Sequence, residues 1–148
     1  MGTLTKPTRL AIEHDLQSFD CEVPSLNNWL KSHARKNDQN GASKTYVVCE
    51  GTKVVGYYCL ANSAIDFGNA TGKTRRNMPN PIPAILIGRL AVDRLWKKRG
   101  IGGDLISDAA YRIFNVADIV GVRAVLVQAI DEAAACFYKQ FGFTESPI

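Results

Sequence analysis

The sequence has few of the features that mark membrane, secreted or metal-binding proteins. No apolar run reaches the roughly 18 residues that a membrane-spanning helix needs, and residues 1–7 contain no apolar signal core. Lys6 breaks the pattern for N-myristoylation. The two histidines and four scattered cysteines, without a C-x-x-C pair, do not have the spacing of a zinc site or a disulfide framework. We therefore expect a cytoplasmic protein with buried thiols and no metal.

Length and composition indicate one globular domain over residues 1–148, because 46% hydrophobic and 22% charged residues are ordinary values for such a chain. The net charge of +4 is unevenly distributed. Basic residues gather in three places: Lys31 to Lys36, Lys73 to Arg76, and Lys97 to Arg99. One such cluster is usually only a solvated surface, but three favour a polyanionic partner.

The order of apolar patterns predicts strands that alternate with helices. A helix is expected over 24–37, a hairpin of strands 45–49 and 54–61, and a central strand over 84–92. A helix then runs to Gly121, followed by a strand over 124–128 and a helix through Gln140 with Asp131 as its N-cap. Residues 66–83 read as a loop, since Pro79, Pro81 and Pro83 exclude regular structure. We therefore predict a mixed α/β fold with a central sheet flanked by helices.

The turn after the central strand is the most informative segment. Gly100, Gly102 and Gly103 lack a Cβ, so the backbone there can approach a ligand closely. The N–H groups in the first turn of the following helix have no partner within the helix, which favours an anion. Lys97, Lys98 and Arg99 add positive charge beside it. The segment therefore predicts a phosphate-binding site.

Two common phosphate motifs do not fit this turn. No Lys-Ser or Lys-Thr follows the glycines, as a P-loop requires, and Leu105 occupies the third glycine position of a dinucleotide fingerprint. The run Lys97-Lys-Arg-Gly-Ile-Gly102 instead resembles the [Q/R]-x-x-G-x-[G/A] signature of the GNAT acetyltransferases, with Lys in place of Gln or Arg at its first position. The resemblance implies that backbone amides from Lys97 to Gly103, Ile101 included, bind the pyrophosphate of acetyl-coenzyme A (acetyl-CoA).

The same resemblance implies roles for two further segments. Leu90, Ala91 and Val92, at the end of the central strand, are expected to contact the acetyl group and the pantetheine arm. The run Ala135-Cys-Phe-Tyr-Lys-Gln-Phe-Gly-Phe143 is similar to the family's closing motif, whose tyrosine gives a proton to the coenzyme sulfur. Tyr138 is therefore the expected catalytic acid, although a lone tyrosine is more often a packing residue. Helical phase predicts that Phe137 and Phe141 face the core while Tyr138 turns toward the cleft edge.

The central strand offers no carboxylate as a general base for the acceptor amine. A lysine amine, with a pKa of about 10.4, needs such help, whereas an α-amine, with a pKa of about 8, needs far less. This favours an acceptor such as the amino group of an aminoacyl ester. The basic clusters would then bind the attached nucleic acid.

Several further segments resemble the GNAT toxins of bacterial type II toxin–antitoxin modules. They are Leu26-Asn-Asn-Trp-Leu30, Gly41 to Val48, Val55-Gly-Tyr-Tyr58, Arg75-Arg-Asn-Met-Pro-Asn-Pro-Ile-Pro83 and Gly88 to Asp93. The resemblance implies N-acetylation of the amino acid on charged tRNA, which stops translation. It also implies a homodimer, a ribbon-helix-helix antitoxin and, through that antitoxin, binding to operator DNA. The candidate tRNA contacts are Lys31, Arg35, Lys36, Arg75 and Arg76.

Similar chains continue beyond the Gly142-Phe143 strand into a last strand, whereas this sequence stops at Ile148, so we expect a GNAT sheet that lacks its last strand and has an exposed edge. Two alternatives to the tRNA-directed enzyme remain open. One is a GNAT enzyme that acetylates protein lysines or small amines. The other is an inactive module that binds only coenzyme A or an antitoxin.

Overall fold

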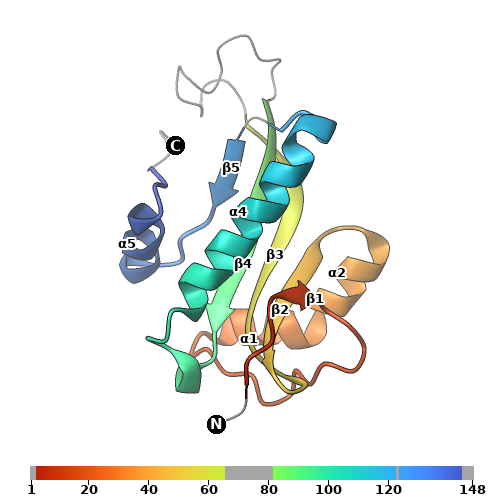
Figure 1. Ribbon diagram of the computed structural model, residues 1–148, viewed down its shortest axis with the longest axis vertical. Coiled ribbons are helices and arrows are strands. Elements are labelled where there is room, and N and C mark those ends of the chain that lie inside the picture. Colours follow the sequence, from red (N-terminus) through yellow and green to blue (C-terminus); the bar gives the residue numbers. More distant parts are fainter. Residues whose placement is uncertain (1–2, 66–81, 123, 145–148) are drawn as a thin grey trace.

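The computed structural model describes residues 3–65, 82–122 and 124–144, which form one mixed sheet with helices on both faces (Figure 1). The strands are β1 (Thr8–Arg9), β2 (Lys44–Glu50), β3 (Lys53–Ile65), β4 (Ile82–Val92) and β5 (Ala124–Val127). The helices are α1 (Pro24–Ser32), α2 (Ala34–Asn40), the 3-10 turn η2 (Arg94–Trp96), α4 (Ile101–Val120) and α5 (Glu132–Gln140). Strands and helices alternate after β3, as the sequence predicts.

The sheet has the order β1-β2-β3-β4-β5 and changes from antiparallel to parallel at its last pair. β2 and β3 form the expected hairpin. β4 runs antiparallel to β3 along its whole length but is paired with β5, in parallel, only over Ala84–Ile87. β5 is the last strand of the sheet among the described residues.

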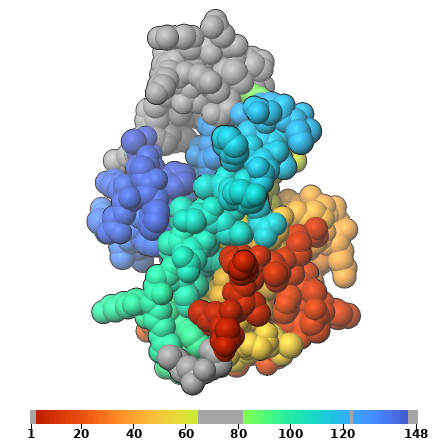
Figure 2. All heavy atoms as spheres, viewed as in Figure 1, coloured from red at the N-terminus to blue at the C-terminus, as the bar shows by residue number. Residues whose placement is uncertain are grey.

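Alternate residues of the strands fill two separate hydrophobic layers. On one face, Val47 and Tyr57 pack against Trp29 and Leu30 of α1. On the other face, α4 packs against a cluster that includes Tyr58. The space-filling view shows α4 across this second face with the N-terminal segment against it (Figure 2), and Arg112 of α4 donates a 3.1 Å hydrogen bond to the Pro7 carbonyl there.

The structure corrects the single helix predicted over 24–37. The chain leaves helical geometry at His33, where φ is −125° and ψ is −23°, so two shorter helices form. This bend lets Ala34, in the first turn of α2, pack in the same layer as Trp29 and Leu30. The packing of both helices on the sheet determines the break at His33, and helix propensity alone does not predict it.

Ile82 and Pro83 were expected in a loop but lie in β4, and Pro83 is opposite Ala64 of β3. Pro83 needs no hydrogen-bond partner for its nitrogen, which has no N–H. It precedes Ala84, the first residue paired with β5, so its missing N–H costs no hydrogen bond on the β5 side. The rest of the predicted loop, residues 66–81, lies outside the described residues.

The second half of the chain agrees closely with the sequence prediction. α4 ends at Gly121 in the left-handed conformation, with φ of 74°, and the Asp131 side chain caps α5 by accepting a hydrogen bond from the Ala134 amide. Phe143 and Thr144, where a strand after α5 was expected, are not in a strand, and the remainder of that expected strand lies outside the described residues. Within the described ranges, no helix combines the length and the apolarity that crossing a bilayer requires.

Candidate active site at the diverging ends of β4 and β5

The site begins where β4 separates from β5. The β3–β4 register shifts between Cys59, which pairs with Arg89, and Leu60, which pairs with Ile87, so Gly88 is the extra residue of a β-bulge. The pairing with β5 ends at the same place, at Ile87. The edge of β4 from Gly88 to Val92 therefore has no strand partner on its β5 side among the described residues, and its backbone groups are available to a ligand.

A cleft of about 640 Å³ opens beside this free edge. It is lined by the end of β4, the start of α4, the segment before and at the start of α1, and the start of α5. The expected cofactor residues Leu90, Ala91, Val92, Lys97, Lys98, Gly100, Ile101, Gly102 and Gly103 all line it. The volume is in the range of small-molecule sites, about 300–1,000 Å³.

One end of the cleft is the N-terminus of α4. Gly100 is the N-cap and has a φ of 81°, a left-handed conformation that a residue with a Cβ rarely adopts. The first hydrogen bond of the helix runs from the Asp104 amide to the Gly100 carbonyl, at 3.0 Å. The amides of Ile101, Gly102 and Gly103 precede it and have no partner within the helix. These donors and the positive end of the helix dipole suit a diphosphate.

The three basic residues before Gly100 differ in their surroundings. Lys97 and Lys98 both line the cleft. The Lys97 ammonium donates to the Cys21 carbonyl at 3.3 Å and lies 3.4 Å from a Glu22 carboxylate oxygen. The Arg99 guanidinium instead lies over the Trp96 ring, 4.7 Å from its centroid. Lys97 thus connects the α4 side of the cleft to the segment before α1.

Gly102 and Gly103 also have a packing role that the sequence analysis did not foresee. A Cβ on Gly102 would lie 3.1 Å from Cζ of Phe137 in α5, and one on Gly103 would lie 3.3 Å from Cζ of Phe141. Side chains at these positions would push α5 away from α4. The two glycines therefore set the width of the cleft as well as exposing the backbone.

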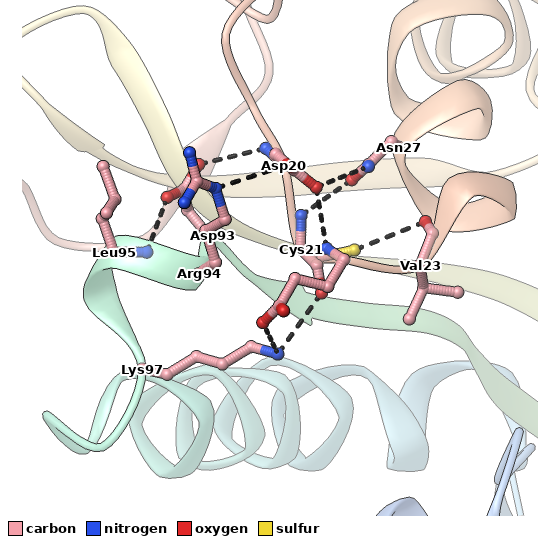
Figure 3. Close-up of polar contacts among 9 residues, drawn as sticks. Asp20, Cys21, Val23, Asn27, Asp93, Arg94, Leu95 and Lys97 are labelled. Carbon is pink, nitrogen blue, oxygen red and sulfur yellow. Dashed lines mark hydrogen bonds and ion pairs between the residues drawn. The ribbon is translucent and has the colours of Figure 1, made fainter.

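The turn between β4 and α4 is fixed by Asp93, a buried carboxylate that the sequence analysis missed (Figure 3). One carboxylate oxygen accepts the Leu95 amide and the other accepts the Asp20 amide, both at 3.0 Å. The Arg94 amide donates to the Asp20 carbonyl at 2.8 Å. These bonds join two segments that are 73 residues apart in the sequence. In the sequence, the only sign of this role of Asp93 is an aspartate directly after a predicted strand.

Asp20 and Asn27 extend this network toward α1 (Figure 3). The Asp20 carboxylate accepts hydrogen bonds from the Glu22 amide at 2.8 Å and the Asn27 side chain at 3.0 Å. These two bonds are the main reason that the pKa of Asp20 is below its ordinary value. We call Asp20, Asn27, Asp93 and Lys97 the clasp, because together they hold the start of α1 against the turn before α4.

Tyr138 lies in α5 close to the cleft but not in its lining. It lines a neighbouring cavity of about 310 Å³ between β5 and α5, and its ring packs against Phe137 and Phe143. Burial raises the pKa of its phenol, and the nearby Cys59 thiol, opposite Arg89 at the bulge, adds to the increase. The phenol therefore stays protonated at neutral pH.

The predicted helical phase of α5 was wrong for Tyr138 and Phe141. Tyr138 is the most buried aromatic residue of the helix, at 7% exposure, whereas Phe141 directly after the helix is 42% exposed. Phe137 is half-buried and lines the cleft. The prediction assumed that the two phenylalanines face the sheet, but the contacts with α4 draw them to its glycines instead.

The described candidate tRNA residues, Lys31, Arg35 and Lys36, do not line the cleft. Lys31 and Lys36 are exposed on α1 and α2. The Arg35 guanidinium is directed inward and donates to three carbonyls of the segment before α1, of which the His14 carbonyl is nearest, at 2.6 Å. It therefore anchors that segment. Arg75 and Arg76 lie outside the described residues. No cluster of metal-ligating side chains occurs in the part of the chain that the structure describes.

The chain is similar in sequence to known acetyltransferases. The profile of the acetyltransferase (GNAT) domain matches residues 41–145. A tRNA-acetylating toxin of Mycobacterium tuberculosis (strain ATCC 25618 / H37Rv) is 42% identical over 147 residues, which are 99% of this chain and 89% of the relative.

Two solved structures of the toxin AtaT have the same fold. AtaT complexed with acetyl-methionyl-tRNAfMet has a TM-score of 0.89 and 30% identity, covering 97% of this chain and 88% of AtaT. A tyrosine-to-phenylalanine mutant of AtaT bound to the C-terminus of the antitoxin AtaR and acetyl-CoA has a TM-score of 0.80 and 32% identity, covering 95% and 84%. The chain therefore belongs to the GNAT acetyltransferase family, in the group that contains these toxins.

Proposed function

We propose that this protein transfers the acetyl group of acetyl-CoA to the α-amino group of the amino acid on aminoacyl-tRNA and thereby blocks translation in the cytoplasm. The observation that carries the proposal is the cleft, which joins phosphate donors at the start of α4 to the unpaired edge of β4. Its relatives include a tRNA-acetylating toxin and a toxin complexed with acetylated aminoacyl-tRNA.

In this proposal the two ends of the cleft hold different parts of acetyl-CoA. The amides of Ile101, Gly102 and Gly103 bind the diphosphate, with Lys97 and Lys98 supplying charge. The free β4 edge, from Leu90 to Val92, accepts the pantetheine arm as an additional strand would be accepted. A backbone amide of that edge polarises the thioester carbonyl.

The described residues that line the cleft offer no free carboxylate as a general base, which favours an acceptor amine of low pKa. Among the described side chains that line it, Asp131 is the one carboxylate, and it already caps α5. Deprotonating a lysine near neutral pH without a base costs about 4 kcal/mol. The α-amine of an aminoacyl ester avoids most of this cost. Its nitrogen forms a bond to the carbonyl carbon, the carbon–sulfur bond breaks, and Tyr138 donates its phenolic proton to the departing sulfur. The nitrogen then loses one proton to solvent, and the tyrosinate takes up a proton from solvent, which restores the phenol.

The tRNA is proposed to lie along α1 and α2, where Lys31 and Lys36 present their ammonium groups to solvent. Arg75 and Arg76 are proposed as further contacts. Arg35 contributes indirectly, because its hydrogen bonds fix the segment that supports α1.

We also propose that the toxin is a homodimer neutralised by a ribbon-helix-helix antitoxin, which brings it to operator DNA. Exposed Tyr111, Phe114 and Ile119 along α4 support the presence of a protein partner. Light scattering of the toxin alone and with its antitoxin measures both states, and a monomer under both conditions contradicts this assembly.

The function is tested with labelled acetyl-CoA and separate pools of charged tRNA, uncharged tRNA, protein and small amines. We expect label in the charged tRNA pool alone, and loss of at least about 100-fold in the rate for Tyr138→Phe. Acetyl-CoA binding by calorimetry should be unchanged in that variant. Tyr46→Phe, which removes the hydroxyl of a half-buried tyrosine of β2 that does not line the cleft, is the matched control and should retain full activity.

Other outcomes would support one of the two alternative functions. Label that appears in protein or small amines and not in charged tRNA identifies a GNAT enzyme with a different acceptor. Binding of acetyl-CoA without turnover identifies an inactive binding module. Undiminished transfer by Tyr138→Phe contradicts the role of this tyrosine.

A further inference from the structure

Arg89 lies next to the proposed reaction site, but it has no role so far in binding the diphosphate or in donating the proton. It follows the bulge residue Gly88 and precedes Leu90, the first β4 residue that lines the cleft. It is opposite Cys59, on the face of the sheet that α1 covers. A substrate that reaches the free edge of β4 from the α1 side would therefore lie next to this arginine.

The Arg89 guanidinium lies over the ring of Trp29, which is itself fixed by a second aromatic ring. Its Cζ lies 4.5 Å from the centroid of the Trp29 ring. Trp29 is only 7% exposed and is stacked nearly parallel on Tyr57, with ring centroids 6.0 Å apart. The Tyr57 hydroxyl donates a 2.7 Å hydrogen bond to the Leu26 carbonyl of α1. The arginine is therefore preorganised by packing and not by an ion pair.

The charge of Arg89 has no carboxylate partner among the described residues. Three other arginines do have one: Arg9 pairs with Asp38, Arg94 with Asp20, and Arg112 with Asp108. The polar contact of Arg89 within the described segments is with the Cys59 thiol, a weak acceptor. A half-buried guanidinium with no carboxylate partner in the described segments is suited to a bidentate contact with a phosphate.

We propose that Arg89, held on Trp29, binds the phosphodiester nearest the 3′ end of aminoacyl-tRNA and so positions the aminoacyl ester beside the thioester. This inference rests on the proposed function. That phosphodiester is separated from the ester by one nucleoside, and acetyl-CoA places its own diphosphate at the start of α4. The two substrates thus use separate phosphate sites at opposite sides of the β4 edge. Arg89 is a positioning residue for the acceptor.

The proposal is tested by removing the phosphate from the substrate as well as the charge from the enzyme. Rates are measured with three acceptors that carry the same amino acid: charged tRNA, an aminoacyl cytidylyl-adenosine with one phosphodiester, and an aminoacyl-adenosine with none. Arg89→Gln should lower kcat/KM roughly 10- to 100-fold on the first two, the effect of losing a charge-assisted contact. On aminoacyl-adenosine it should be unchanged within about twofold.

Two variants and one binding measurement complete the experiment. Arg89→Lys keeps the charge but loses the planar fork, so its loss should be smaller and again confined to acceptors with a phosphate. It also provides the test if the glutamine variant does not fold. Arg9→Gln, on the distant β1 strand, is the control and should match the parent on all three acceptors. The Kd for acetyl-CoA should be the same in every variant.

Equal losses on all three acceptors would overturn the proposal, because the arginine would then act on structure or on chemistry. A weaker Kd for acetyl-CoA would assign Arg89 to the coenzyme instead, and unchanged rates on all acceptors would leave it without this role. These results differ from a failure of the proposed function, in which the parent protein acetylates no charged tRNA.

Discussion

Replacing Asp93 should destabilise the protein more than a replacement of any exposed aspartate. Its carboxylate is 3% exposed and accepts the amides of Asp20 and Leu95, both at 3.0 Å. A hydrogen bond to a charged group contributes about 1.5–3 kcal/mol, so Asp93→Ala should lower the free energy of unfolding by about 3–6 kcal/mol. This is a large part of the about 5–15 kcal/mol that stabilises a typical domain. Asp93→Asn keeps one acceptor and should lose about half as much.

The assay is urea unfolding, read as a change in midpoint at constant slope. Asp131→Ala is the matched control, since it removes one exposed cap bond and should cost about 1 kcal/mol. Because the clasp also fixes the turn before α4, Asp93→Asn should weaken acetyl-CoA binding in calorimetry. A loss of less than about 1 kcal/mol in Asp93→Ala would refute the view that this carboxylate joins the two segments.

Three further predictions follow from the same contacts. Gly102→Ala places a Cβ 3.1 Å from Phe137 and should cost about 1–3 kcal/mol, measured by urea unfolding; if Phe137→Leu in the same chain recovers no stability, this packing is not the cause. Lys97→Gln loses an exposed ion pair worth about 1 kcal/mol or less, but it should raise the Kd for acetyl-CoA in calorimetry, and an unchanged Kd excludes a role for its charge in binding. Burial raises the pKa of Tyr57 and Tyr58 above that of an unfolded tyrosine, about 10. Folding therefore favours their protonated forms, so their contribution is complete below about pH 10 and falls above it; urea unfolding from pH 8 to 11 that shows no such fall contradicts their burial.

Local signals in the sequence were sufficient for the second half of the fold. α4 begins after Gly100 and ends before Gly121, and each of these glycines has a left-handed conformation. Asp131 caps α5 through a hydrogen bond to a residue three positions away. The unpaired amides of the turn before α4 were predictable for the same reason, since they belong to consecutive residues. The split at His33 was not predictable, because burial of Ala34 beside α1 determines it.

Contacts between distant segments account for the remaining differences. Asp93 and Asp20 are joined only in the folded chain, and the orientation of Phe141 depends on Gly103 of another helix. The stack of Arg89 on Trp29 likewise joins a strand to a helix that is far away in the sequence. Patterns of periodicity describe one element at a time and do not contain these pairings.

The most direct test of the central claim is the mass of the aminoacyl end of charged tRNA after incubation with the protein and acetyl-CoA. Nuclease digestion releases the aminoacyl-adenosine, and fragmentation locates any added group. We expect the added mass of one acetyl group on the α-nitrogen. An unmodified aminoacyl-adenosine, with acetyl groups found on lysine side chains or small amines instead, would contradict it.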